Sequence, residues 1–135
     1  MDAIKIDVVK KTVEEIQIDG SLESMYQALD CRCIERVVLL RTQSGWVESC
    51  WVDDSGLLRE KPLGGFLIEG YPSAISGHGL ILGTDKQGKN ASTRLWKELV
   101  EMHVRFGDTI GHTLISLPGG PLVEANILEQ WAWPF

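Results

Sequence analysis

The stretch from residue 46 to residue 90 constrains the fold of this chain more than any other. Segment 46–52 is rich in aromatic and β-branched residues, which is typical of a strand. The sequence Asp53-Asp54-Ser55-Gly56 then predicts a tight turn, because Gly56 can adopt a positive φ angle. Segment 79–83, which reads Gly-Leu-Ile-Leu-Gly, predicts a short buried strand. The stretch therefore favours a sheet of short strands joined by tight turns.

Three more strands and a short helix are predicted before this stretch. Segments 4–8 and 13–18 carry apolar residues at strand spacing and are expected to form a hairpin that ends at Asp19-Gly20. Segment 34–41 is rich in β-branched residues and is expected to pair antiparallel with 46–52. A helix is predicted over 21–29, with Asp19 or Ser21 as its N-cap and an apolar face of Leu22, Met25, Tyr26 and Leu29.

A longer helix is predicted after this stretch, over residues 91–106, with Asn90 as its N-cap. Its apolar residues recur at helical spacing: Leu95, Trp96, Leu99, Val100, His103 and Phe106. Segment 62–70 predicts a loop, with or without one helical turn. Beyond Gly107 the periodicity ends.

These elements predict a single α+β domain in which one short and one longer helix pack on an antiparallel β-sheet. The 135 residues suffice for one hydrophobic core and are too few for two ordinary domains. We expect residues 1–106 to form the core domain and residues 107–135 an apolar C-terminal extension. Because that extension carries Trp131, Trp133 and Phe135, it is expected to pack on the core or to form the interface of a homo-oligomer.

The formal net charge of −6 argues against tight wrapping of DNA or RNA, since that binding depends on Lys and Arg residues that neutralise phosphates. The N-terminal residues lack the charged and apolar segments of a signal peptide, and no apolar run approaches membrane-spanning length. We therefore expect a cytoplasmic protein with no membrane association. Its cysteines, Cys31, Cys33 and Cys50, are expected to be reduced thiols.

Segment 83–90, Gly-Thr-Asp-Lys-Gln-Gly-Lys-Asn, differs from a phosphate-binding P-loop at its last residue. Asn90 lacks the hydroxyl group that would bind Mg²⁺, so nucleotide hydrolysis is not expected. A milder interpretation is that Lys86, Lys89 and Arg94 attract an anion at the N-terminus of the predicted helix. The alternative is a solvated loop before a capped helix, which is the more frequent case.

Trp51 and His78 complete the set of candidate ligand-binding residues. The face of a tryptophan suits a flat nucleobase, although core packing explains most of the five tryptophans. His78 lies beside glycines at a strand end, where it could line a pocket, but the sequence fixes no acid or nucleophile near it. His103 is expected to be a core histidine. No metal site is expected, because the cysteines lack the usual spacing of zinc ligands. No catalytic set and no cofactor are expected either.

Three segments, in this order and spacing, resemble a known family: Gly20-Ser21-Leu22-Glu23, Trp51-Val52-Asp53-Asp54-Ser55-Gly56-Leu57-Leu58 and Gly77-His78-Gly79-Leu80-Ile81-Leu82-Gly83-Thr84-Asp85. The chain resembles the small domain of unknown function 3846, common in phage and plasmid genomes, over about residues 4–95. It departs from that family at Pro62-Leu63-Gly64, where the family has a Pro-x-Asn segment, and in its longer tail after Phe106.

The resemblance implies an origin in a mobile element, most simply a bacteriophage, and no general activity. We therefore expect a non-enzymatic protein that acts in the host cytoplasm. The first expected function is counter-defence, in which the protein binds and sequesters a host nucleotide immune signal with His78, Lys86, Lys89, Arg94 and Trp51. The alternative is inhibition of a host defence or nucleic-acid enzyme by direct protein–protein binding, through the acidic turn at Asp53-Asp54 and the aromatic tail.

Overall fold

The computed structural model describes residues 1–54 and 63–107. It contains antiparallel sheets and two helices, so the predicted α+β class is confirmed. The elements, in chain order, are β1 (Asp2–Asp7), β2 (Thr12–Gln17), α1 (Leu22–Leu29), β3 (Ile34–Arg41), β4 (Val47–Asp53), β5 (Gly65–Ile68), β6 (Ile75–Ser76), β7 (Gly79–Thr84), β8 (Asn90–Ala91), α2 (Lys97–His103) and β9 (Val104–Gly107).

The larger sheet has the strand order β2-β1-β7-β4-β3, and β8 pairs with the end of β7. The two predicted hairpins, β1–β2 and β3–β4, are therefore present, and β7 joins them. The smaller sheet has the order β6-β5-β9. The strand pairs of both sheets are antiparallel.

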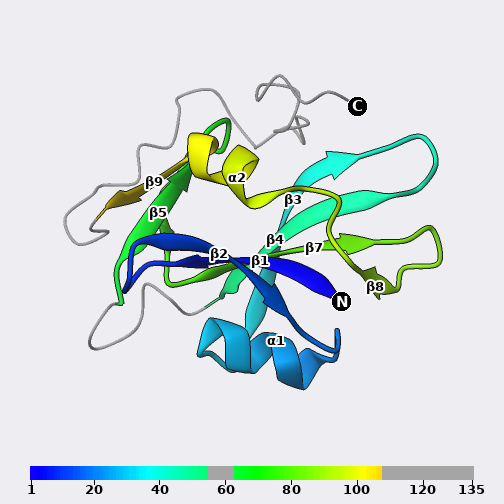
Figure 1. Cartoon of the computed structure of the whole chain (residues 1–135), viewed down its shortest axis with the longest axis horizontal. Helices are drawn as coiled ribbons and strands as arrows, with labels where there is room; N and C mark the ends of the chain where they lie inside the picture. The colour runs from blue at the N-terminus through cyan, green and yellow to red at the C-terminus, as the bar shows by residue number, and fades with distance from the viewer. Residues whose placement is uncertain (55–62, 108–135) are drawn as a thin grey trace.

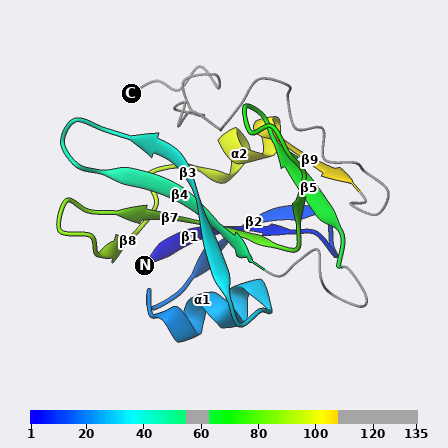
Figure 2. The same cartoon turned by 180° about the vertical axis from the view of Figure 1, so that it is seen from behind.

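The molecule has three layers (Figures 1 and 2). Helix α1 lies on one face of the larger sheet, and the smaller sheet with α2 lies on the other. The main core fills the space between the two sheets and contains apolar residues of β1, β3, β4, β5, β7 and α2. A second apolar cluster lies under α1, where Met25 and Leu29 contact Leu80 and Leu82 of β7. Each face of β7 thus meets a core, which explains why all six of its residues are buried.

Two glycines of β7 permit close packing, whereas the sequence marks them only as strand boundaries. A Cβ atom on Gly79 would lie 2.8 Å from the ring of Phe66, and one on Gly83 would lie 2.1 Å from the ring of Trp46. The aromatic rings therefore rest directly on the backbone of the central strand. Gly79 and Gly83 are packing requirements as well as strand ends.

The helix predicted over 91–106 is shorter, and this prediction is corrected at both ends. Asn90 does not cap a helix: it pairs with Thr84 as part of β8, and its side chain donates to the carbonyl of Gly20. The helix begins only at Lys97, and from Val104 the chain pairs with β5 instead of continuing the helix. The apolar positions are confirmed in part, since Leu95, Leu99 and Val100 are all buried. Hydrogen bonds to residues distant in the sequence therefore determine where this helix begins and ends.

Two local predictions, one near the N-terminus and one in the middle of the chain, have different outcomes. Ser21 is the N-cap of α1, because its side chain accepts the N–H of Ser24, while Leu22 of the predicted apolar face is 53% exposed. The loop predicted over 62–70 contains strand β5, so that prediction is wrong. The segment is only four residues long and lies among glycines, so its sequence pattern is too weak to predict a strand. It forms a strand because it pairs with β9.

Several predictions concern residues outside the described ranges. They include the end of the turn at Ser55-Gly56 and the interface residues Trp131, Trp133 and Phe135. The division at residues 106 and 107, and self-association through the tail, remain predictions for the same reason. Neither of the two described helices has the length and hydropathy needed to span a membrane.

Candidate functional site

The five predicted ligand residues do not form one site. His78 directly precedes β7 and Lys86 follows its other end, and six strand residues between them span about 20 Å. Lys89 and Arg94 lie at the Lys86 end. Trp51 lies in β4 on the α1 side of the sheet, partly buried against the second apolar cluster. The structure thus separates His78 and Trp51, which pairs with Leu80, from the three cationic residues. Binding of a nucleotide by these residues stays a prediction.

The loop at residues 85–89 is a β-turn that joins β7 to β8. The carboxylate of Asp85 accepts the backbone N–H groups of Gln87 and Lys89, at 2.9 and 3.0 Å. The N–H of Gly88, which has φ +83°, donates to the carbonyl of Asp85. These are the donors that a P-loop would offer to phosphate, and the turn leads into a strand instead of a helix. The anion site expected at a helix N-terminus therefore lacks its helix here.

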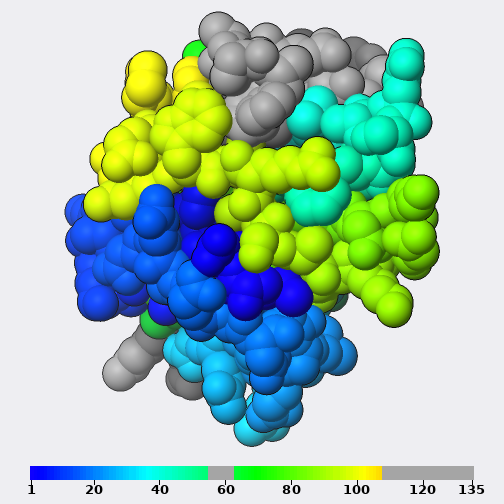
Figure 3. Space-filling model, turned by 45° about the vertical axis from the view of Figure 1, so that its right-hand side comes forward, coloured from blue at the N-terminus to red at the C-terminus, as the bar shows by residue number. Residues whose placement is uncertain are grey.

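Arg94 and Trp46 form a stacked pair held by Glu48. The guanidinium carbon of Arg94 lies 3.8 Å from the ring centroid of Trp46. Glu48 is fully buried, and its carboxylate accepts from Trp46 Nε1 at 2.7 Å, from Thr93 Oγ1 at 2.5 Å and from the backbone N–H of Arg94 at 3.0 Å. This network fastens the segment between β8 and α2 to the larger sheet. Figure 3 shows that segment, in yellow-green, crossing the molecule beside the β3–β4 hairpin in cyan.

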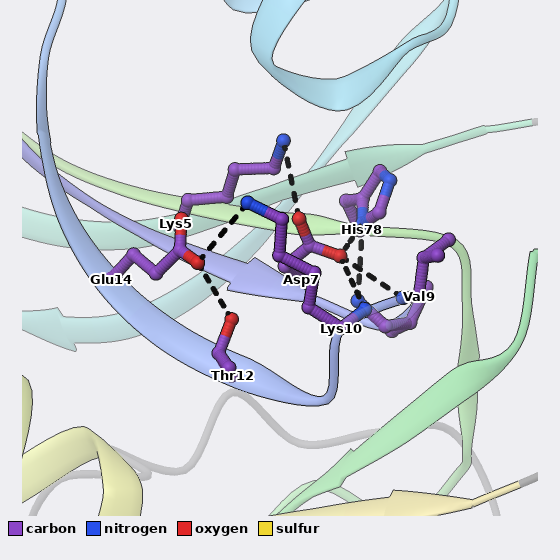
Figure 4. A network of polar contacts seen from close by, with 8 residues as sticks. Lys5, Asp7, Val9, Lys10, Thr12, Glu14 and His78 are labelled. Atoms are coloured by element: carbon purple, nitrogen blue, oxygen red, sulfur yellow. Dashed lines mark hydrogen bonds and ion pairs between the residues drawn. The ribbon is translucent and has the colours of Figure 1, made fainter.

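His78 has the acidic neighbour that the sequence could not identify. Its Nδ1 atom accepts the backbone N–H of Val8 at 3.1 Å and lies 3.7 Å from Asp7 Oδ1 (Figure 4). Asp7 Oδ1 also accepts the N–H groups of Val9 and Lys10, both at 3.0 Å. Because Nδ1 is an acceptor, the neutral imidazole carries its proton on Nε2. The pair holds the β1–β2 turn against the start of β7.

A second buried carboxylate, that of Asp53, lies at the same end of the larger sheet, on the strand that flanks β7 opposite β1. Gly79 pairs with Ile6 of β1 and with Val52 of β4, so Asp7 and Asp53 both lie one residue beyond that row. A Cβ atom on Gly77 would lie 3.5 Å from the Cβ of Asp53. Asp7, Asp53 and His78 are 5%, 8% and 6% exposed. Buried polar groups are costly, so three such groups at the ends of adjacent strands mark this end of the sheet as a candidate site.

Burial raises the pKa of Asp7, but the other effects outweigh it: the N–H of Lys10, the charges of His78 and Lys5, and the N–H of Val9. The net result is a pKa below the ordinary value of 3.8. A carboxylate with a lowered pKa in the folded state stabilises the fold above its unfolded pKa, and this contribution is lost as the pH falls through the folded pKa.

We therefore expect Asp7→Asn to remove part of the acid sensitivity of the fold. In urea unfolding, the difference in the free energy of unfolding between wild type and variant should shrink as the pH falls below about pH 4. Asp54→Asn, at an exposed position directly after β4, is the control. A difference for Asp7→Asn that does not change between about pH 5 and about pH 2.5 would contradict the expectation.

An open groove of about 830 Å³ adjoins Asp53. Its walls are one face of α1, the residues that lead into β3 and the end of β4. Its lining residues are Glu23, Tyr26, Gln27, Asp30, Cys31, Arg32, Cys33 and Asp53. Three carboxylates against one guanidinium leave two net negative charges. The last turn of α1 carries no basic residue, so its carbonyl end adds to the negative potential. The groove therefore favours cationic groups.

The three cysteines differ in their exposure and in their reactivity. Cys31, Cys33 and Cys50 are free thiols, and the described residues contain no group of three or more side chains that could hold a metal ion. Cys33 is exposed in the groove. Burial raises the pKa of Cys50 to about 12, against a weak opposing effect from the backbone of Leu80, so this thiol is unreactive at neutral pH.

His103 is not a core residue, so that prediction is wrong. Its ring contacts the carboxylate of Glu69 at the edge of a hollow near α2. The apolar spacing of the predicted helix placed His103 on the buried face, but the helix ends at this residue and the chain turns into β9.

The sequence interpretation named Asp53 but missed the other groove residues. A usable signal was present, because Glu23, Tyr26, Gln27 and Asp30 recur at spacings of three, four and seven residues and share one face of α1. Asp7 gave a weaker signal as an aspartate that ends a strand before a turn. No sequence signal identified Glu48 as a buried acceptor, because an acidic residue in a predicted strand is usually exposed.

A protein-family model described as a domain of unknown function (DUF3846) matches residues 1–105. The match includes all elements from β1 to α2, the groove and the Asp7–His78 pair. Comparisons with curated proteins and with solved structures gave no significant match.

Proposed function

The chain belongs to the DUF3846 family of domains of unknown function, and from that premise we propose that it is a non-enzymatic protein that binds a cationic segment of another protein in the groove beside α1. The observation that carries the proposal is the lining of this groove. It holds three carboxylates, one guanidinium and the aromatic ring of Tyr26, next to the carbonyl end of a helix. Arginine and lysine side chains satisfy such a surface.

The second of the two functions expected from the sequence fits this surface. Enzymes that act on nucleic acids carry positive surfaces for phosphate, and an acidic groove competes for them. We propose that the protein is phage-encoded and acts in the host cytoplasm by binding a host defence or nucleic-acid enzyme. The turn at Asp53-Asp54 contributes to the contact, because Asp53 lines the groove. The action is stoichiometric, without turnover.

Nucleotide sequestration is a second candidate, which one observation favours. A Cβ atom on Gly45 would lie 2.9 Å from the Cβ of Lys86, so the β3–β4 and β7–β8 turns adjoin near Arg94 and Trp46. A phosphate could contact these cations if Arg94 left the indole. Incubation with a bacterial nucleotide extract, followed by mass spectrometry of the bound material, tests this. Nucleotide that is retained by wild type and lost with Arg94→Ala would favour sequestration over the groove.

Reversal of charge in the groove should abolish partner binding. We expect Glu23→Lys/Asp30→Lys to weaken binding of a hexaarginine peptide and of a captured host protein at least about tenfold, because the groove changes from two negative charges to two positive ones. Glu98→Lys/Glu101→Lys on α2 makes the same change in net charge away from the groove. Fluorescence anisotropy at fixed ionic strength measures the affinity. Equal losses in both variants would indicate a general charge effect and contradict the proposal.

Protection of Cys33 offers an independent readout. Its thiol is exposed in the groove, whereas Cys50 is buried and unreactive, so alkylation of the folded protein at neutral pH reports on the groove. A partner that occupies the groove should slow the labelling of Cys33. A bound partner that leaves the labelling rate unchanged occupies another surface.

A further inference from the structure

We propose that His78 makes binding in the groove dependent on pH, so that cationic ligands bind more weakly when the imidazole is protonated. The inference rests on the proposed function of the groove. Its geometric basis is the position of His78 at the start of β7, which lies between β1, whose Asp7 pairs with His78, and β4, whose Asp53 lines the groove. Imidazole is the side chain that changes charge between about pH 5 and pH 8, where carboxylates of ordinary pKa remain ionised.

Protonation must change the contacts of the ring. The Nδ1 lone pair accepts the N–H of Val8 in the structure. A proton taken from solvent at Nδ1 would face that N–H, so two donors would oppose each other. The hydrogen bond with Val8 breaks, and Nδ1–H turns to Asp7 Oδ1, which lies 3.7 Å away. The β1–β2 turn and the start of β7 therefore adjust together.

The added positive charge changes the electrostatic potential of the groove, because it lies at the end of the sheet that carries Asp53. The charged groups at this end of the sheet come from two strands: Asp7, which contacts the ring, and Lys5, which pairs with Asp7, from β1, and Asp53, which lies beside Gly77, from β4. Glu23 and Asp30 follow on α1, the helix packed on this face of the sheet. A positive charge beside Asp53 lowers the attraction of the groove for a cation. By linkage, a bound cation disfavours protonation of His78 by the same factor.

The test compares wild type with His78→Asn and His103→Gln, using a hexaarginine peptide at about pH 8 and about pH 5.5, on either side of the ordinary imidazole pKa, at constant ionic strength. The asparagine of the first variant retains an acceptor for the N–H of Val8 but cannot be protonated. His103 lies away from the groove and serves as the control. We expect wild type and His103→Gln to bind about fivefold more weakly at the lower pH, the size of a screened interaction between two charges. His78→Asn should lose this dependence.

Nuclear magnetic resonance of the free protein tests the coupling without any ligand. The imidazole nitrogen shifts of His78 should report the Nε2–H tautomer at the higher pH, and the resonances of Tyr26 and Cys33 in the groove should follow its titration. The inference would be overturned if the groove resonances did not change as His78 titrates. It would also be overturned if the affinity of His78→Asn for the peptide kept the full pH dependence of the wild type. If the peptide fails to bind wild type at either pH, the proposed function fails, while the free-protein titration still decides the coupling.

Discussion

Replacement of Glu48 by alanine is expected to destabilise the fold by about 3–5 kcal/mol, because it removes a fully buried carboxylate and leaves three partly buried donors without their acceptor. The donors are the indole N–H of Trp46, the hydroxyl of Thr93 and the backbone N–H of Arg94. A domain of this size has a total stability of about 5–15 kcal/mol, so the variant should unfold at a much lower urea concentration. Urea unfolding followed by tryptophan fluorescence measures the change.

The control for Glu48 is Glu35→Ala on the exposed side of β3, which should change stability by less than about 0.5 kcal/mol. Hydrogen exchange gives a local readout. The amide of Arg94 is protected by Glu48 and should exchange faster in Glu48→Ala, whereas the amides of β1 exchange only as global stability allows. A loss below about 1 kcal/mol in Glu48→Ala would show that the network does not fasten the segment between β8 and α2.

The second large effect is expected from Gly83→Ala, at about 2–4 kcal/mol, because overpacking displaces a rigid ring. The new methyl group would lie 2.1 Å from the ring of Trp46 and 3.0 Å from the carbonyl of Ser92, which is backbone. The ring can move only by breaking its hydrogen bond to Glu48 and its stacking on Arg94. Thermal and urea unfolding measure the loss.

Gly107→Ala is the matched control, because a Cβ atom added there would have no heavy atom of the described residues within 4 Å and its backbone φ lies outside the left-handed region. That substitution should be close to neutral. The double variant Gly83→Ala/Trp46→Leu should recover part of the loss, since a smaller side chain leaves room for the methyl group. Additive losses in the double variant would contradict contact between residues 83 and 46.

The candidate site was predictable in part. His78 and Asp53 were identified from their positions at strand ends and in an acidic turn, and both belong to the buried cluster at one end of β7. Lys86, Lys89 and Arg94 were identified from a motif whose meaning depended on a helix after Asn90. The chain forms β8 there, and the carboxylate of Asp85 accepts the backbone N–H groups of the turn. A motif transfers its chemistry only with its structural context.

The sequence by itself determined the elements whose signals are local. Alternating apolar residues specify the strands of the β1–β2 hairpin, and β-branched and aromatic residues specify those of the β3–β4 hairpin. Ser21 caps α1 through the N–H of Ser24. Only the tertiary structure decided the start of α2, the strand character of β5 and β9, and the partners of Asp7, Glu48 and His78. Those contacts join residues 46 positions apart, as in Glu48 and Arg94, or 70 apart, as in Val8 and His78. A buried donor needs an acceptor, but the local sequence does not indicate which residue provides it. The packing of the layers determines which distant residue supplies the acceptor.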